Sequence, residues 1–594
     1  MSSNLTNSTP DLGEHEIVSE TDEATSYLSL NYTPANHEIP QRYTQWEVVD
    51  VDMELLMRIR AGPRGAVEDD EDYTYDDDVN ANVNVDVKVN EEDDESSDSF
   101  SMVPSKEGAR LMNSGSFGQD EVEIISPCHK TNLGHQKKLS MRILDRELAI
   151  ESQVRQKINQ RLMAQAMIPS SIADFIIEFS NPVYSGQFSD DGNFFFTANK
   201  DFKVRMYDTA NPYDWRYYKT VSYPYGRWTL TDASLSPDNR YLAYTSIQSN
   251  VCLAPTDPND IGDPYILDLK GDRGSFFGIW SIRYSGDGQN LVAGTTGGLI
   301  VVYDIEARTQ LHQIKGHDHD VNAVCLADRS SPHILYSGSD DKTIKVWDTR
   351  SMGDNRAAGI LVGHIEGITY IDSKGDGRKF DDFAIYGDAK LTYSGYVLSN
   401  GKDQRAKLWD VRMTISSHDY EKYRATRTDR TYFDYRFGYY NEDLWYRDPH
   451  DCSLVTYCGH KVLKTLIRCH FSPSDSTNSR YIYSGSQDGM VYIWNLDATI
   501  AGKIKVYQSK EYFKLVSPWP FHTVTEVFER GLWETCVRDV SWHPNAPIIV
   551  ASSWHGHGSD IGTCTVHSWN DGANDDEAEP KMGRRVDEKL KQLT

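Results

Sequence analysis

Cysteine, long apolar runs and basic charge are all scarce in this sequence. Eight cysteines are spread thinly over 594 residues, which disfavours a disulfide framework and favours a reducing, intracellular compartment. No stretch approaches about 18 consecutive apolar residues, and no basic start leads into an apolar core, so we expect neither a membrane span nor a secretory signal. The 61 basic side chains face 89 acidic ones, a net charge of −28, which argues against a general nucleic-acid binder.

Motifs for nucleotide, metal or nucleophilic chemistry are also missing. The sequence has no phosphate-binding loop and no His-Glu-x-x-His zinc motif. A set of potential ligands does gather in the C-terminal part, but no two of its cysteines have the two-to-four residue separation that is typical of a structural zinc site. The set comprises Cys452, Cys458, His460, Cys469 and His470. We therefore expect no metal, no cofactor, no catalytic residues and no enzymatic activity.

The chain divides into two unlike parts. Residues 1–138 are predicted to be largely disordered, because Glu68–Asp98 carries fifteen acids and one base and cannot bury enough apolar surface to offset the entropy of ordering. An apolar island, Trp46–Arg60, is either a binding motif or a locally sticky piece of this acidic region. Apolar residues at three- and four-residue steps then predict an amphipathic helix over 139–168, which either packs on its own domain or is presented to a partner.

After residue 170 the chain repeats one pattern, and this pattern decides the fold. The clearest unit runs from Gly316-His317 through two apolar strands and an Asp turn to Trp347-Asp348, which is typical of a four-stranded WD-repeat blade. One unit with a degenerate end lies at 231–246, and six others end in an aromatic residue before Asp or Asn, at Tyr207, Tyr303, Trp347, Trp409, Trp494 and Trp569. We therefore predict an all-β fold, a seven-bladed WD40 β-propeller over residues 170–570, preceded by the amphipathic helix and the disordered acidic region.

The propeller is expected to carry insertions and a tail. The spacing of the repeats places insertions at about 374–393, 413–455 and 500–533, and a charged C-terminal tail covers 571–594. Closure of a propeller also needs a strand from one terminus to complete the last blade, and the weakly alternating Asp174–Phe179 is the candidate.

The polar residues of the repeat look like a catalytic set, but we interpret them as structural. In the clearest unit they are His317, Ser337, Asp341 and Trp347. In a WD repeat such groups satisfy one another's hydrogen bonds away from water and make the blade rigid.

The insertion at 413–455 is crowded with aromatic residues interleaved with arginines. Both residue types are favoured where proteins bind partners, and we take Tyr435, Arg436 and Trp445 as candidate partner-binding residues. The alternative is a long loop that packs its rings on the propeller and pairs its arginines with acidic residues.

Two blades end in a more specific motif. Trp347-Asp-Thr-Arg350 and Trp409-Asp-Val-Arg412 resemble the Trp-Asp-x-Arg box of the substrate receptors that dock on the damaged-DNA-binding adaptor of cullin-4 RING ubiquitin ligases. Longer strings, Gly367–Asp376, Thr465–Pro473 and Cys536–Pro544, resemble the WD-repeat protein 23 family of such receptors, and the likeness covers about residues 170–570.

The resemblance implies a non-catalytic subunit that docks on the ligase adaptor and presents protein substrates for ubiquitination. Asp348, Arg350, Asp410 and Arg412 would support docking, and the family suggests a nuclear and cytoplasmic location. An arginine just past a strand end can reach a partner's carboxylates or carbonyls in a forked way, and an Asp two residues earlier can hold it. The alternative role of each box is a blade-to-blade salt bridge.

Some features depart from the family, and a second function stays open. The other blade ends lack the arginine, and His555 stands where the family has the turn Asp. The alternative function is a general WD40 interaction scaffold outside a ligase, for example in RNA processing or transport. Neither function implies a small-molecule substrate or a membrane partner, and the net charge of −28 argues against a nucleic-acid partner.

Overall fold

The computed structural model describes mainly the C-terminal two-thirds of the chain. The described residues are 104–114, 116–117, 144, 147, 164–260, 262–271, 276–328, 331–375, 395–426, 433–436, 440–506, 535–555, 561–569 and 581–583. The segments Trp46–Arg60 and Glu68–Asp98 lie outside them, as do most of the insertions predicted at 374–393 and 500–533. Of the helix predicted over 139–168, Leu144, Glu147 and 164–168 are described, and Leu144, Glu147 and Ala164 are helical.

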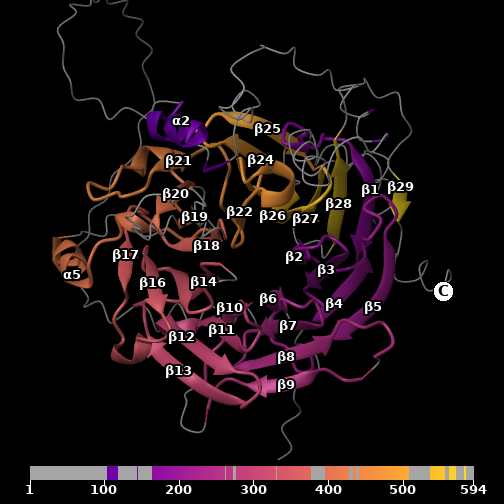
Figure 1. Cartoon of the computed structure of the whole chain (residues 1–594), viewed down its shortest axis with the longest axis horizontal. Helices are drawn as coiled ribbons and strands as arrows, with labels where there is room; N and C mark the ends of the chain where they lie inside the picture. Colours follow the sequence, from indigo (N-terminus) through magenta and orange to yellow (C-terminus); the bar gives the residue numbers. More distant parts are fainter. Residues whose placement is uncertain are drawn as a thin grey trace, which may run out of the picture. The chain divides into compact units, whose positions relative to one another are not determined.

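Within residues 96–594, seven β-sheets lie around a common centre (Figure 1). The first three blades are β2 (Val183–Phe188), β3 (Phe194–Asn199), β4 (Lys203–Asp208) and β5 (Arg216–Ser222); β6 (Leu230–Leu235), β7 (Tyr241–Ser246), β8 (Asn250–Pro255) and β9 (Tyr265–Asp268); and β10 (Ile279–Tyr284), β11 (Asn290–Thr295), β12 (Leu299–Asp304) and β13 (Thr309–Lys315). In each blade the strands follow chain order from the centre outward.

The next three blades repeat this order. They are β14 (Val321–Leu326), β15 (Ile334–Ser339), β16 (Ile344–Asp348) and β17 (Gly359–Leu361); β18 (Ile368–Ser373), β19 (Tyr396–Gly401), β20 (Ala406–Asp410) and β21 (Val455–Tyr457); and β22 (Cys469–Phe471), β23 (Tyr481–Ser484), β24 (Met490–Asn495) and β25 (Ile500–Lys505). The insertion predicted from residue 500 therefore begins later, because Ile500–Lys505 is the outer strand of the sixth blade.

The seventh blade joins the two ends of the propeller. It contains β26 (Thr535–Trp542), β27 (Ile548–His555), β28 (Gly562–Ser568), β1 (Ala173–Phe179) and β29 (Lys581–Gly583). Strand β1 pairs antiparallel with β28, with Ile176 opposite Thr565, and β29 adds a parallel strand on its outer side. The seven-bladed propeller and the closing strand at Asp174–Phe179 are thus confirmed, and β27 pairs with β26 up to His555.

The helices are short and lie outside the sheets. Those whose bounds lie within the described residues are α2 (Lys106–Asn113), α5 (Ser417–Thr426) and α6 (Ser474–Thr477), with 3-10 turns η1 (Thr296–Gly298), η2 (Met352–Asp354), η3 (Val411–Met413) and η4 (Glu442–Leu444). Among the described residues, no helix is long and apolar enough to cross a membrane.

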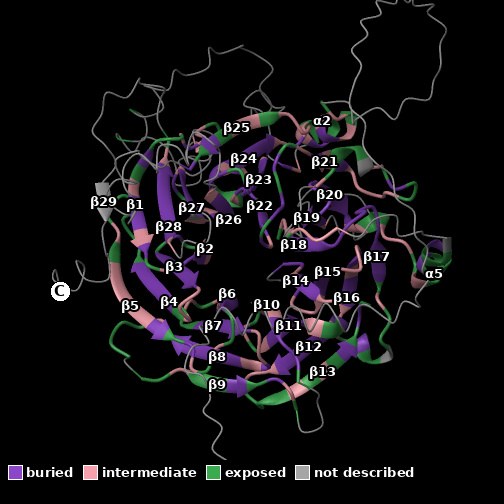
Figure 2. Ribbon diagram, turned by 180° about the vertical axis from the view of Figure 1, so that it is seen from behind, coloured by how far each residue is buried: buried purple, intermediate pink, exposed green. Residues whose placement is uncertain are grey.

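The turn sequences explain where the inner hairpins reverse. In Ser236-Pro-Asp-Asn239 the serine hydroxyl donates to Asp238 at 2.6 Å and accepts the backbone N–H of Tyr241 at 3.0 Å, and Asn239 has a φ of 60°. Asparagine and glycine tolerate this left-handed backbone better than other residues. The apolar residues on either side become the buried inner strands, while outer strands such as β9 and β13 keep exposed residues (Figure 2).

Six of the seven inner strands share a β-bulge near their first residue. A register shift there leaves one residue of each strand without a direct partner on the neighbouring strand; these residues are Tyr184, Thr231, Trp280, Asn322, Thr369 and Arg538. A bulge re-aims the extra side chain. The six residues therefore lie at equivalent positions around the centre of the propeller.

The antiparallel order gives the propeller two distinct faces. Turns from the first to the second strand and from the third to the fourth lie on one face, which we call the arginine face because Arg350 and Arg412 follow the third strands β16 and β20. Turns from the second to the third strand, and the connections between blades, lie on the other face, which we call the opposite face.

An ordered segment packs on the arginine face within the region predicted to be disordered. Ser105 caps helix α2, and its backbone N–H donates to Asp497 O at 2.8 Å, just past β24 of the sixth blade. Leu111 and Phe117 are buried in the cluster that also holds Tyr396, and Phe117 is only 1% exposed. The prediction for 1–138 did not anticipate this segment, because its few apolar residues gain burial only from the assembled propeller.

Candidate functional site

The Asp and Arg of each Trp-Asp-x-Arg box form a forked ion pair at the end of a strand. Arg350 Nε and Nη2 lie 2.9 Å from Asp348 Oδ1 and 2.6 Å from Asp348 Oδ2. Arg412 makes the same two bonds to Asp410, at 2.9 and 2.5 Å. The predicted pairing within each box is therefore present, and neighbouring blades carry the two boxes on one face.

The fork fixes each arginine while leaving it accessible. Hydrogen bonds from Arg350 are the largest influence on the pKa of Asp348 and lower it, and the hydrogen bond to Asp410 raises the pKa of Arg412. The Arg350 and Arg412 side chains are 68% and 52% exposed. Because a held guanidinium loses little entropy on binding, both are suited to a partner's carboxylates or carbonyls.

The ordered N-terminal segment reaches the second box. The ring of Phe117 lies 5.0 Å from that of Tyr396, which lies opposite Asp410 of the second box in the fifth blade. Lys374 donates to Ser116 O and lies 4.1 Å from the Phe117 ring centroid. Sequence reasoning missed Phe117, although a capping Ser105 followed by apolar residues was a usable signal.

The other predicted residues lie on the opposite face, not with the boxes. Tyr435 lies under Lys402 in the second turn of the fifth blade, with the Lys402 Nζ 4.4 Å from its ring centroid, and Arg436 forks onto Asp434 at 2.9 and 2.7 Å. The Trp445 ring lies 5.0 Å from the Arg405 guanidinium. These contacts match the packing alternative, so a partner-binding role for the three residues stays a prediction.

The polar set of the fourth blade forms the expected buried network. His317 bonds Asp341 at 2.8 Å and Ser337 at 2.7 Å, and the Trp347 indole N–H donates to the same serine at 2.8 Å. The fifth blade repeats this with His364, Ser399, Asp403 and Trp409. Ser337 and Ser399 are fully buried, so no substrate can reach either hydroxyl.

We expect Ser399→Ala to lower the free energy of unfolding by about 1–3 kcal/mol, because the His364 and Trp409 nitrogens lose their shared partner in a buried site. Urea-induced unfolding measures the change. Ser484→Ala is the control, since Ser484 occupies the equivalent position of β23 but bonds backbone carbonyls and, at 3.3 Å, the Asn400 amide instead of a histidine and a tryptophan. Equal losses in both variants would contradict a special role for the network.

The sixth blade departs from this pattern. His460, which follows Gly459 as His317 follows Gly316, does not join such a network in its own blade, because its Nε2 bonds Asn400 Oδ1 of the fifth blade at 2.7 Å. Burial lowers the pKa of His460 to about 3, so it is neutral. Within the part of the chain that the structure describes, no three His, Cys, Asp or Glu side chains gather so as to hold a metal ion.

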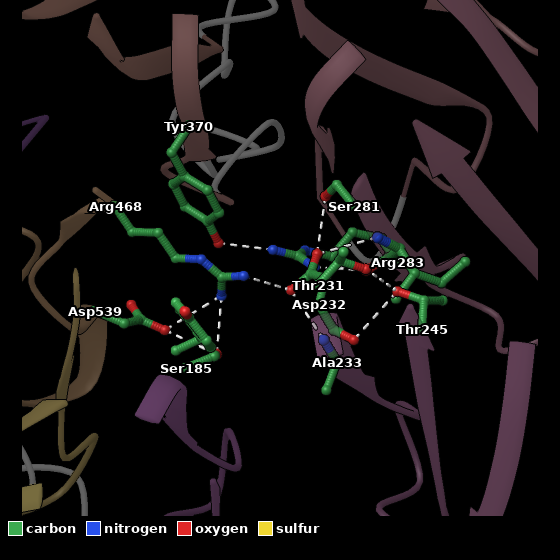
Figure 3. Close-up of polar contacts among 12 residues, drawn as sticks. Ser185, Thr231, Asp232, Ala233, Thr245, Ser281, Arg283, Tyr370, Arg468 and Asp539 are labelled. Carbon is green, nitrogen blue, oxygen red and sulfur yellow. Dashed lines mark hydrogen bonds and ion pairs between the residues drawn. The ribbon is translucent and has the colours of Figure 1, made fainter. Parts of the chain in front are cut away.

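A second polar network, missed from the sequence, links the inner strands across the centre (Figure 3). Arg468, just before β22, bonds Asp232 at 2.8 Å and Asp539 at 3.2 Å, which belong to the second and seventh blades. Arg283 of β10 bonds Asp232 at 2.5 Å and the Tyr370 hydroxyl at 2.7 Å. All five residues are shielded, so the network ties blades together rather than binding a ligand. An arginine inside an otherwise apolar inner strand was the available signal.

A funnel of about 590 Å³ opens beside this network on the arginine face, lined by first-turn residues of all seven blades. His470 lies in it, with Nε2 3.0 Å from Asp539 and Nδ1 3.7 Å from Asp372. Burial alone would lower the pKa of His470, but the two carboxylates raise it to about 9. A histidine that is already protonated is a poor general base, which fits a non-catalytic scaffold.

Comparison with known proteins agrees with the fold. The WD domain, G-beta repeat family matches residues 174–208, 308–348 and 452–495. The LEC14B protein of Lithospermum erythrorhizon is 39% identical over 64% of this chain and 72% of its own length, and the LEC14B homolog of Prunus armeniaca is 38% identical over 64% and 71%. The DDB1- and CUL4-associated factor 11 homolog of Caenorhabditis elegans is 30% identical over 65% of this chain and 60% of its own length.

Proposed function

Because this chain belongs to the WD-repeat protein 23 family, whose members include DDB1- and CUL4-associated factor 11 homologues, we propose that it is a substrate-recognition subunit of a cullin-4 RING ubiquitin ligase. In this role it docks on the ligase adaptor and holds substrate proteins near a ubiquitin-charged enzyme. The rate gain comes from raised effective concentration and not from bond chemistry on the propeller.

The observation that carries the proposal is a pair of arginines on the arginine face, each fixed by an ion pair with an aspartate of its own box. Arg350 and Arg412 each extend from a strand end, each is fixed by its own Asp, and the two boxes belong to adjacent blades. Such preorganised, charged donors form directional bonds to carboxylates and carbonyls at low entropic cost. The remaining blade ends lack this arrangement, so the docking surface covers the fourth and fifth blades.

The ordered segment 104–117 extends the same surface. It lies across the third turn of the sixth blade and the first turn of the fifth, beside Arg412. The proposed docking surface therefore includes residues that precede the propeller in the sequence. The helix predicted over 139–168 is a second N-terminal segment that we include in it. A chain that starts at Pro169 is expected to bind the adaptor more weakly than the full chain.

The combined Arg350→Ala and Arg412→Ala variant is expected to recover at least about tenfold less adaptor in a pull-down, since a hydrogen bond to a charged group contributes roughly 1.5–3 kcal/mol. The matched control is Arg216→Ala with Arg240→Ala. These two exposed arginines also follow an Asp by two residues on the arginine face, but their ion pairs are loose, at 3.7 Å.

Equal recovery of the adaptor by both double variants would remove the boxes from the docking surface. A stable complex without cullin or adaptor, recovered with the full chain, would instead favour the alternative scaffold function in RNA processing or transport.

A further inference from the structure

The opposite face presents an unusual aromatic loop between the first two blades. In the connection from β5 to β6, residues 223–229, Tyr225 is 89% exposed and Trp228 is 50% exposed. Phe276, in the connection before β10, is also exposed and lies 5.7 Å from the guanidinium of Arg227. Contiguous exposed aromatic surface is a feature of interaction sites.

The loop is strained and held in place. Tyr225 and Trp228 have φ values of 62° and 64°, a left-handed backbone that costs bulky residues about 1–3 kcal/mol each and clusters at functional sites. Ser246 fixes the loop by accepting the Arg227 N–H at 3.0 Å and donating to Thr229 O at 2.9 Å. The aromatic side chains are therefore presented by a rigid loop.

The exposed loop is continuous with the centre of the propeller. The Trp228 ring lies 6.0 Å from Tyr184 and 6.2 Å from Trp280, which are bulged residues of β2 and β10. A third bulged residue, Arg538, places its guanidinium 5.2 Å from the Tyr184 ring. The bulges thus line up two aromatic rings and one cation beside Trp228.

Arg538 is a buried cation without a carboxylate. It is only 7% exposed, its Nε has no hydrogen-bond partner, and its Nη1 donates to the carbonyl of Tyr184. The nearby carboxylates, Asp232 and Asp539, are bound by Arg468, and no described carboxylate lies within ion-pair distance of Arg538. Burial lowers the pKa of Arg538 to about 10, so the charge persists at neutral pH.

A groove continues outward from the loop between β5 and the turn before β9. It has a volume of about 930 Å³ and is lined by Tyr218, Pro224, Tyr225, Pro258, Pro264 and Ile266, among others. A peptide segment that lies on the loop has room to continue along this groove.

We propose that a substrate segment with an aromatic side chain next to a carboxylate binds on this aromatic surface, the rings of Tyr184, Tyr225, Trp228, Trp280 and Phe276. The aromatic side chain stacks on Trp228, and the carboxylate pairs with Arg538 or Arg227. A cationic partner is disfavoured, because the Arg538 guanidinium already lies over the Tyr184 ring and would repel it. That the bound segment belongs to a substrate rests on the proposed function, whereas the binding surface itself does not.

The test selects ligands from a random peptide display library on the full-length chain and measures the consensus peptide by fluorescence anisotropy. We expect the consensus to pair an aromatic residue with Asp or Glu. Trp228→Ala and Arg227→Glu should each weaken its binding by about tenfold or more. Leu311→Ala on β13, at a side chain that is 47% exposed, is the control and should bind normally.

Two results would overturn the proposal: a consensus that keeps its affinity when its carboxylates are changed to amides, or normal binding by Trp228→Ala. The same variants are assayed for adaptor pull-down. A variant that loses the peptide but still recovers the adaptor supports the aromatic surface. A full chain that binds the peptide but recovers no adaptor in the pull-down refutes the ligase role and leaves the aromatic surface intact.

Discussion

Replacement of Arg468 by methionine is expected to lower the free energy of unfolding by about 3–5 kcal/mol, among the largest effects of any single change in the propeller. Arg468 is the shared cation of Asp232 and Asp539, and all three groups are buried. Burial alone would raise the pKa of both carboxyls, but Arg468 contributes to holding them below their usual value. Without it, buried negative charge is left only partly compensated. Urea-induced unfolding at pH 7 measures the loss.

Acidification should reduce the difference in the free energy of unfolding between this variant and the wild type. In the wild type the lowered pKa values of Asp232 and Asp539 contribute stability that is present above pH 4 and lost as the pH falls below it. In Arg468→Met the same carboxyls bind protons more readily in the folded state, so the penalty shrinks from pH 7 toward pH 5. Arg240→Met, at an exposed site, is the control. If the stability difference between Arg468→Met and the wild type did not change with pH, the two carboxyls would not be the source of the penalty.

His470 should make the propeller less stable as the pH rises through the alkaline range. Its pKa is about 9 in the folded chain, because Asp372 and Asp539 outweigh its burial, against roughly 6.5 for an unfolded histidine. A raised pKa contributes stability that is fully present below pH 6.5 and lost by about pH 9. The shift corresponds to about 3 kcal/mol, from 1.36 kcal/mol per pKa unit.

The difference between the wild type and His470→Gln isolates this contribution, because cysteines and tyrosines titrate in both proteins. The stability difference should be largest near pH 6 and fall by about 3 kcal/mol toward pH 9.5. A difference that stays constant across this range would mean that His470 is not charged in the folded chain.

The blade count and the closing strand were predictable because the signals are local. Most blades repeat a serine-containing turn, an apolar strand and a terminal aromatic residue, which only the second blade lacks, and β1 alternates before the first repeat. The Asp–Arg forks were predictable for the same reason, since the two residues are only two positions apart.

Contacts between distant segments were not predictable in this way. Arg468 and Asp232 lie 236 positions apart, and no local pattern shows that they meet at the centre. Phe117 reaches Tyr396 only after the fifth blade has formed, and the separation of Tyr435, Arg436 and Trp445 from the boxes follows from which turn each one contacts. A single sequence carries the composition of such sites but not their geometry.

The register of β1 has a consequence for synthesis in the cell. Ile176 pairs with Thr565, so the strand that leaves the ribosome among the first waits for a partner about 390 residues later. At roughly 5–20 residues per second, this delay is on the order of 20–80 s. During that time the edges of β1 are unpaired and able to pair with another chain. Nascent molecules are therefore the aggregation-prone species, and we expect chaperones to bind them.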